Sequence, residues 1–250
     1  MKKVFATLTV LAMLTFGSAA LMAQEAAAPA EEAGGLVALH KTLKTKFIEG
    51  GAGFMALTLV TLVFGLALCI ERIIYLSLSK TNTKELLANI EAALKEGGIE
   101  KALEVCRNTR GPVASIFYQG LSRYDEGIDV VEKTVASYGG VQLGLLEKNL
   151  SWISLFISIA PSLGFLGTII GMIAAFDKIQ QVGDISATVV AGGIKVALLT
   201  TLLGLIIAIV LQLFYNYILS LIEGLVNEME DSSISLLDIV VEFDAAQKKK

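Results

Sequence analysis

The sequence predicts an all-α fold: an integral membrane helical bundle with three transmembrane helices that extend into a cytoplasmic helical region. Of the 250 residues, 54% are hydrophobic and only 18% are charged. The mean hydropathy of +0.69 is far above that of a soluble domain of this length. Three apolar runs are each long enough for the roughly 20 helical residues that cross a bilayer. The polar sequence between them keeps a helical spacing of apolar residues.

The N-terminal residues 1–23 have the pattern of a secretory signal peptide. Two lysines precede an apolar run, and small residues lead to a cleavage site predicted after Ala23. An uncleaved signal anchor is the alternative interpretation. Residues 24–52 are predicted to form a periplasmic linker, rich in Ala, Glu and Gly at first. Its second half, residues 36–49, is predicted to form an amphipathic helix on the membrane surface.

The apolar runs predict transmembrane helices at residues 53–76, 151–176 and 193–217. The long loop 77–150 carries nine lysines and arginines, whereas the short loop 177–192 carries only one. Positive charge concentrates on the cytoplasmic side of membrane proteins. The long loop and residues 218–250, a C-terminal helix and tail, are therefore expected in the cytoplasm. The short loop and the N-terminus are expected on the opposite, outer side of the membrane.

The cytoplasmic loop is predicted to contain several helices. Gly97-Gly98 breaks the first of them, and Gly111-Pro112 separates the second from the third. The helix over 128–147 meets no strong stop signal before the second apolar run, so a continuous helix is expected there. Residues 221–241 keep a helical apolar pattern and are expected to extend the third transmembrane helix.

Small residues form a stripe on the second transmembrane helix. Gly164, Gly167 and Gly171 share one face of the helix and would allow a neighbouring backbone to approach closely, as would Gly204 on the third. Pro161 is predicted to bend the second helix near mid-membrane. These residues predict tight packing between the two helices.

Two threonines are predicted to line a shared polar path. Thr168 lies about eight residues, or roughly 12 Å, from the outer end of the second helix. Thr201 lies at a matching depth in the third helix, on a narrow stripe of small residues. Hydroxyls in membrane helices often bond back to their own helix, which is the competing interpretation.

Charged residues are confined to the ends of the apolar runs. Glu71 and Arg72, at the inner end of the first run, are a candidate ion pair at the membrane interface. Lys195 enters the third run near its outer end. It is expected either to snorkel to the surface or to pair with Asp177 or Asp184. Proton carriers normally need a titratable group inside the membrane, so an ion-conducting chain of this sequence would take a carboxylate from a partner.

Other classes of function lack support in the sequence. The net charge of −4 gives no basic excess for binding nucleic acid, and one histidine and two cysteines without a cluster argue against a metal site. The two cysteines are expected to be free. No nucleophile–base pair or phosphate-binding loop indicates an enzyme, and no cofactor is expected.

Three segments resemble known membrane helices. The run APSLGFLGTIIGMIAAF, Ala160–Phe176, resembles the second helix of the MotA/TolQ/ExbB proton-channel family. The run GIKVALLTTLLGLIIAI, Gly193–Ile209, followed by Tyr215-Asn216, resembles its third helix. The run LCIERIIYL, Leu68–Leu76, resembles the end of its first helix. The resemblance is greatest to the ExbB branch of the family.

The resemblance implies a function and a set of partners. Five copies would form a homo-pentamer in the bacterial inner membrane, with the N-terminus in the periplasm. They would surround the helices of an ExbD-like single-span subunit, which supplies a membrane aspartate. Proton passage would then drive outer-membrane transport through a TonB-like protein. Thr168 and Thr201 match the pore-facing threonines of the family. Val196 departs from the family pattern, where many relatives have glutamate, and Val210 departs where many have proline.

Several alternatives remain open at this point. A TolQ-like subunit fits the same residues, and either protons or sodium ions fit as the coupling ion. A MotA-like stator would be expected to have a further span and a larger motor-binding region. A membrane scaffold that conducts nothing is a separate class. It would keep the glycine packing but have no need of the two threonines.

Overall fold

The computed structural model describes residues 35–183 and 187–248, and within these ranges every regular element is a helix. This confirms the all-α fold class. The predicted signal peptide and residues 24–34 of the predicted linker lie outside the described residues, whereas the helix predicted over 36–49 is present as α2. The chain divides into two units at Thr45 and Lys46. In the first unit the described residues belong to α2, Gly35–Glu49, whose last turn lies in the second unit.

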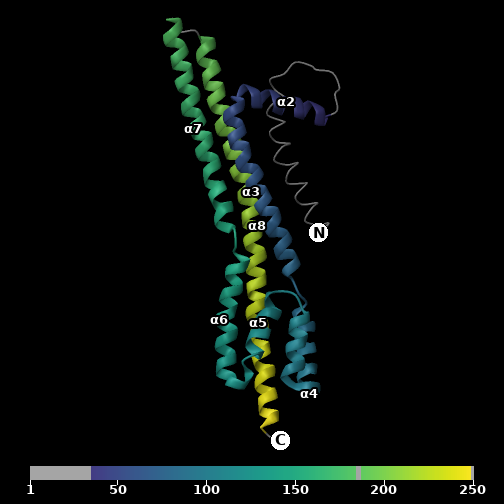
Figure 1. Ribbon diagram of the computed structural model, residues 1–250. Helices are drawn as coiled ribbons and strands as arrows, with labels where there is room; N and C mark the ends of the chain where they lie inside the picture. Colours follow the sequence, from purple (N-terminus) through teal and green to yellow (C-terminus); the bar gives the residue numbers. More distant parts are fainter. Residues whose placement is uncertain (1–34, 184–186, 249–250) are drawn as a thin grey trace. The chain divides into compact units, whose positions relative to one another are not determined.

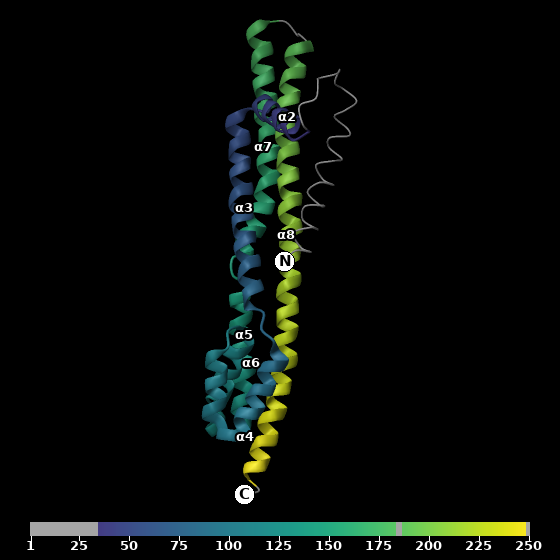
Figure 2. The same ribbon diagram turned by 90° about the vertical axis from the view of Figure 1, so that its right-hand side faces the viewer.

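Among the described residues, three helices are long and apolar enough to cross a membrane: α3 (Ala52–Ser79), α7 (Leu150–Val182) and α8 (Ala187–Gln247). They run side by side in the second unit (Figures 1 and 2). The buried face of α3 repeats every three or four residues, which is the period of a helix. Its members are Met55, Thr58, Thr61, Gly65, Cys69, Arg72 and Leu76.

The predicted helical region between the first two apolar runs contains α4 (Thr83–Asn108), α5 (Pro112–Leu121), a short 3₁₀ turn η2 (Tyr124–Glu126) and α6 (Ile128–Leu146). Gly98 interrupts α4 with a φ of 70°, a left-handed conformation that favours glycine. Pro112 is the first residue of α5, where a backbone N–H would have no acceptor within the helix, so the missing N–H of proline costs no hydrogen bond. The predicted breaks at Gly97-Gly98 and Gly111-Pro112 are confirmed.

The expected continuity of α6 and α7 is wrong. α6 ends at Leu146, and α7 begins at Leu150 after a turn in which Asn149 has a φ of 67°. Asparagine tolerates this left-handed conformation better than most side chains, so the chain turns without glycine or proline. The carbonyl of Asn149 accepts the backbone N–H of Trp152 at 3.2 Å. The other expectation is confirmed, because α8 continues through residues 221–241 as one helix of 61 residues.

The polar half of the second unit has a core of large side chains. Phe117 of the short helix α5 is fully buried, as are Ile90 of α4, Val131 of α6 and Leu236 of α8. Helix α5 therefore lies inside a small bundle formed by its neighbours. In the apolar half, by contrast, only 28% of the most apolar stretch of α3 and 22% of that of α7 is buried.

Candidate functional site

The hydroxyls of Thr168 on α7 and Thr201 on α8 are hydrogen-bonded to each other. Both side chains are half-buried. Further acceptors lie within reach: the Gly164 carbonyl accepts from Thr201 Oγ1 at 3.1 Å, and the Ala197 carbonyl accepts from Thr168 Oγ1 at 3.2 Å. The structure therefore brings the two predicted threonines together across two helices.

The hydrogen-bonding capacity of this pair is limited by its protons. Each hydroxyl has one proton to donate and two lone pairs that accept. When Thr168 donates to Thr201, Thr201 donates onward to the Gly164 carbonyl; in the reverse direction, Thr168 donates to Ala197. Both protons are then in use, so the pair accepts a hydrogen bond from a third group as it stands and donates one only when a hydroxyl releases its backbone carbonyl. It cannot itself ionise near neutral pH.

The glycines bring α7 and α8 into backbone contact around the threonines. A Cβ added at Gly204 would lie 2.5 Å from the Ala160 carbonyl oxygen, and one at Gly164 would lie 3.0 Å from the Thr200 carbonyl oxygen. A Cβ at Gly171 would lie 3.1 Å from the Ala197 nitrogen. Such spacing leaves no room for a side chain. Pro161 lies within the same helix, one turn before Gly164.

Helix α3 reaches the contact between α7 and α8 at Gly167. A Cβ there would lie 2.7 Å from Thr200 Cβ and 2.8 Å from a ring carbon of Phe54 on α3. The four glycines therefore lie where two or three helices meet, in contrast to glycines such as Gly224 that have open space beside them. At this contact the threonines supply hydroxyl groups, and the glycines supply the space that lets the helix backbones touch.

Thr200 was missed by the sequence reasoning. It is 2% exposed, and its hydroxyl donates to the Ala197 carbonyl at 2.7 Å, with the Gly164 carbonyl at 3.4 Å. A helical wheel separates Thr200 from Thr201 by about 100°, so only one of them lay on the predicted stripe. Thr58 and Thr61 of α3 were also missed, although their spacing with Gly65 is a visible helical signal. Both bond back to carbonyls of their own helix.

The sequence profile of the MotA/TolQ/ExbB proton channel family matches residues 108–231. That segment includes both threonines and all four glycines. The chain belongs to the MotA/TolQ/ExbB proton channel family.

Curated relatives carry ExbB names. A biopolymer transport protein ExbB homolog from Methanothermobacter thermautotrophicus is 30% identical over 169 residues, which are 67% of this chain and 60% of that protein. The biopolymer transport protein ExbB of Aquifex aeolicus is 37% identical over 73 residues, 29% of this chain and 49% of that protein. The ExbB of Helicobacter pylori is 36% identical over 74 residues, 30% of this chain and 51% of that protein. The chain thus spans about half to three-fifths of the length of these relatives.

In this MotA/TolQ/ExbB family member, Lys195 has a partner that was not predicted. Its Nζ lies 2.9 Å from Oε2 of Glu49, and the same oxygen lies 3.1 Å from Nζ of Lys46. The turn at Gly51, with a φ of 84°, brings Glu49 beside the start of α8. Hydrogen bonds from Lys195 and then from Lys46 hold the pKa of Glu49 below its usual value. Of the two expectations for Lys195, the alternative of pairing with Asp177 is wrong, and Asp184 lies outside the described residues. The side chain is 51% exposed, in line with the other expectation that it reaches the surface.

The other end of α3 carries the candidate ion pair. Arg72 Nε donates to Glu71 Oε2 at 2.7 Å, and Nη2 donates to Oε1 at 2.5 Å. The Arg72 side chain is only 4% exposed, whereas that of Glu71 is 47% exposed. The guanidinium also lies 4.6 Å from the Tyr75 ring centroid and reaches the Leu145 carbonyl at 3.4 Å. Arg72 thereby connects α3 to the last turn of α6.

The two cysteines are free and buried. Burial raises the pKa of the Cys106 thiol to about 12, so this side chain stays protonated near neutral pH. Cys69 lies on the buried face of α3. Both act as small packing residues. No group of three or more possible metal-binding side chains occurs in the described part of the chain.

Proposed function

We propose that this multi-pass membrane protein is an ExbB-like subunit of a transducer driven by the proton-motive force in the bacterial inner membrane. Its work would be to power TonB-dependent outer-membrane transport. The observation that carries the proposal is the bonded pair of Thr168 and Thr201 where α7 and α8 touch. Membership of the family and the names of the curated relatives support it.

The chemistry of the pair requires a carboxylate from elsewhere. Threonine hydroxyls position a proton but do not release one, and the middle of each apolar run has no Asp or Glu. We therefore assign the titratable group to the membrane aspartate of an ExbD-like single-span subunit. An ionised carboxylate would accept a hydroxyl proton, and a protonated one would donate to a hydroxyl. Hydrogen bonds of this kind offset part of the cost of a charge in the membrane.

The proposed assembly is a pentamer of this chain around the partner helices, with a TonB-like protein carrying the motion outward. The exposed apolar side chains of the spans, such as Phe165 and Leu198, would then contact lipid or other copies. The proposed topology places the N-terminus in the periplasm and the C-terminus in the cytoplasm. The nine basic residues of 77–150 favour this orientation.

The experiment that tests the proposal is reconstitution of the complex into vesicles. This chain is purified with its single-span subunit, the mass of the intact complex gives the subunit number, and proton uptake is followed under an imposed potential. Thr168→Ala combined with Thr201→Ala is expected to abolish uptake while the complex keeps its mass. Unchanged uptake would defeat the assignment of the threonines. A complex that never conducts protons would indicate a scaffold.

A further inference from the structure

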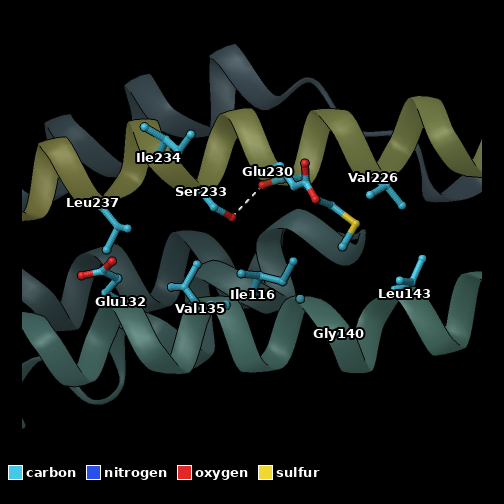
Figure 3. Close-up of a pocket in the computed structure, with 13 residues that line it drawn as sticks. Ile116, Glu132, Val135, Gly140, Leu143, Val226, Glu230, Ser233, Ile234 and Leu237 are labelled. Carbon is cyan, nitrogen blue, oxygen red and sulfur yellow. Dashed lines mark hydrogen bonds between the residues drawn. The ribbon is translucent and has the colours of Figure 1, made fainter.

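A groove lies between α6 and α8, outside the apolar parts of the helices (Figure 3). Its volume is about 550 Å³, and Ile116 of α5 and Val135 of α6 form part of its floor. A second hollow continues along the same two helices and shares Leu143 and Val226 with the first. Together they form one groove, called here the α6–α8 groove. It extends along α8 from Leu219 to Leu237, roughly 27 Å of helix.

The α6–α8 groove carries charge of one sign. Glu132 and Glu230 line its first part, and Glu147 and Glu223 line its second. All four glutamates are exposed. Among the described residues that line either part, none is lysine or arginine. The groove thus combines an apolar floor with acidic edges, which complements a segment that is apolar on one face and basic on the other.

One edge of the groove has small residues with nothing packed on them. Ala136, Gly140 and Gly144 are spaced four apart on α6, and all three are exposed. A Cβ added at Gly139, Gly140 or Gly144 would meet no atom within 4 Å. The neighbouring helix α5 differs, because a Cβ at Gly120 would lie 2.5 Å from Val135 Cγ2. Glycine weakens a helix, and no described part of the chain packs on Gly139, Gly140 or Gly144 in a way that requires it. Such a face lets the backbone of another helix approach closely.

We propose that the α6–α8 groove binds a basic amphipathic helix, supplied by the cytoplasmic segment next to the membrane span of the single-span partner subunit. This rests on the proposed function, which supplies the partner and puts the groove in the cytoplasm. The groove begins at Leu219, two residues beyond the end of the third apolar run at Tyr217. A segment that leaves the membrane beside α8 therefore meets the groove first. Such segments are rich in lysine and arginine on the cytoplasmic side.

The first test measures peptide binding to the full-length chain in lipid nanodiscs. The probe is a synthetic helical peptide with leucines on one face and lysines on the other, and its counterpart has glutamate in place of lysine. The lysine peptide is expected to bind and the glutamate peptide to fail. Glu132→Lys combined with Glu230→Lys is expected to weaken binding about tenfold. Glu104→Lys, an exposed residue of α4 outside the groove, is the matched control and should change nothing.

Equal binding of the two peptides would overturn the proposal, as would binding that survives the two charge reversals. Either result would mean that the acidic edges do not select the occupant. Loss of binding in the Glu104→Lys control would also count against it, because a general effect of net charge would then explain the data.

The second test identifies the occupant in membranes. A photo-cross-linking side chain replaces Ile234, which lines the groove and is 63% exposed, or Ala88, an exposed residue of α4. Cross-links to the single-span subunit are expected from position 234 and not from position 88. Cross-links from position 234 to a second copy of this chain, or to lipid alone, would overturn the proposal.

The two proposals fail in different ways. If the single-span subunit co-purifies and the vesicles conduct protons, but position 234 forms no cross-link to it, the groove proposal is wrong and the proposed function stands. Absence of both the subunit and the proton uptake defeats the proposed function and, with it, the proposed source of the helix.

Discussion

Helix α8 takes part in two kinds of packing along its length. In its apolar half it meets α7 through glycines and threonines, and a Cβ at Gly204 would lie 2.5 Å from the Ala160 carbonyl oxygen. In its polar half it meets α4, α5 and α6 through large side chains such as Leu236, which packs in the core that includes Phe117. Water drives the second kind of packing, because apolar side chains leave it on folding. Lipid gives no such drive, so close backbone contact and hydrogen bonds must hold the first.

The two kinds of packing also suit the apolar and polar halves of the molecule to different roles. A core of interlocked large side chains has one packing and resists change. A contact made of small residues and hydroxyls exposes polar atoms at the place where two helices meet. In this chain the hydroxyl pair of Thr168 and Thr201 lies in the contact of small residues and hydroxyls between α7 and α8, the first kind of packing. The polar half would then support the spans, while the apolar half would hold the groups that interact with a proton carrier.

The largest loss of stability is expected from a substitution in the core of the polar half. Phe117→Ala removes a fully buried ring from its core and should lower the free energy of unfolding by about 3–5 kcal/mol. Phe165→Ala is the matched control, because that ring is 64% exposed on the apolar half, and it should change stability by about 0.5 kcal/mol or less. Thermal unfolding of the full chain in detergent measures both. Similar losses from the two variants would contradict the contrast.

The next effect tests close contact in the apolar half. Gly204→Ala places a methyl group against backbone and should cost about 1–3 kcal/mol, with separation of α7 and α8. Gly224→Ala lies on the same helix with nothing within 4 Å and should stabilise the chain by about 0.5–1 kcal/mol. Unfolding midpoints give both signs. A stabilised Gly204→Ala variant would show that α7 and α8 do not touch there.

The smallest effect concerns the charges at the start of α8. The lowered pKa of Glu49 means that its ion pairs contribute stability above the ordinary value of 4.5 and lose it as the pH falls through the lowered pKa. Lys195→Met should move the pKa of Glu49 back toward 4.5 by more than Lys46→Met does, because Lys195 has the larger effect. Carboxylate ¹³C NMR during a pH titration measures both shifts. The opposite order would assign the main partner to Lys46.

The sequence predicted the fold class and the meeting of the two threonines because both follow from helical periodicity. Length and composition identify the apolar helices. Thr168 and Thr201 lie at equal depth in the membrane on the small-residue faces of two helices, which places them opposite each other. The break before α7 was not predicted, because Asn149 turns the chain without the usual glycine or proline. The ion pair of Lys195 and Glu49 was not predicted either. It joins residues far apart in sequence through a turn whose direction the local pattern does not define.

The most direct test of the central claim compares two double variants in the reconstituted complex. Thr168→Ser with Thr201→Ser keeps both hydroxyls, whereas Thr168→Val with Thr201→Val keeps the shape and removes them. If the hydroxyl pair positions the proton carrier, the serine variant should take up protons at close to the original rate and the valine variant should not. Equal uptake by the two variants would contradict the claim, because the site would then need only its shape.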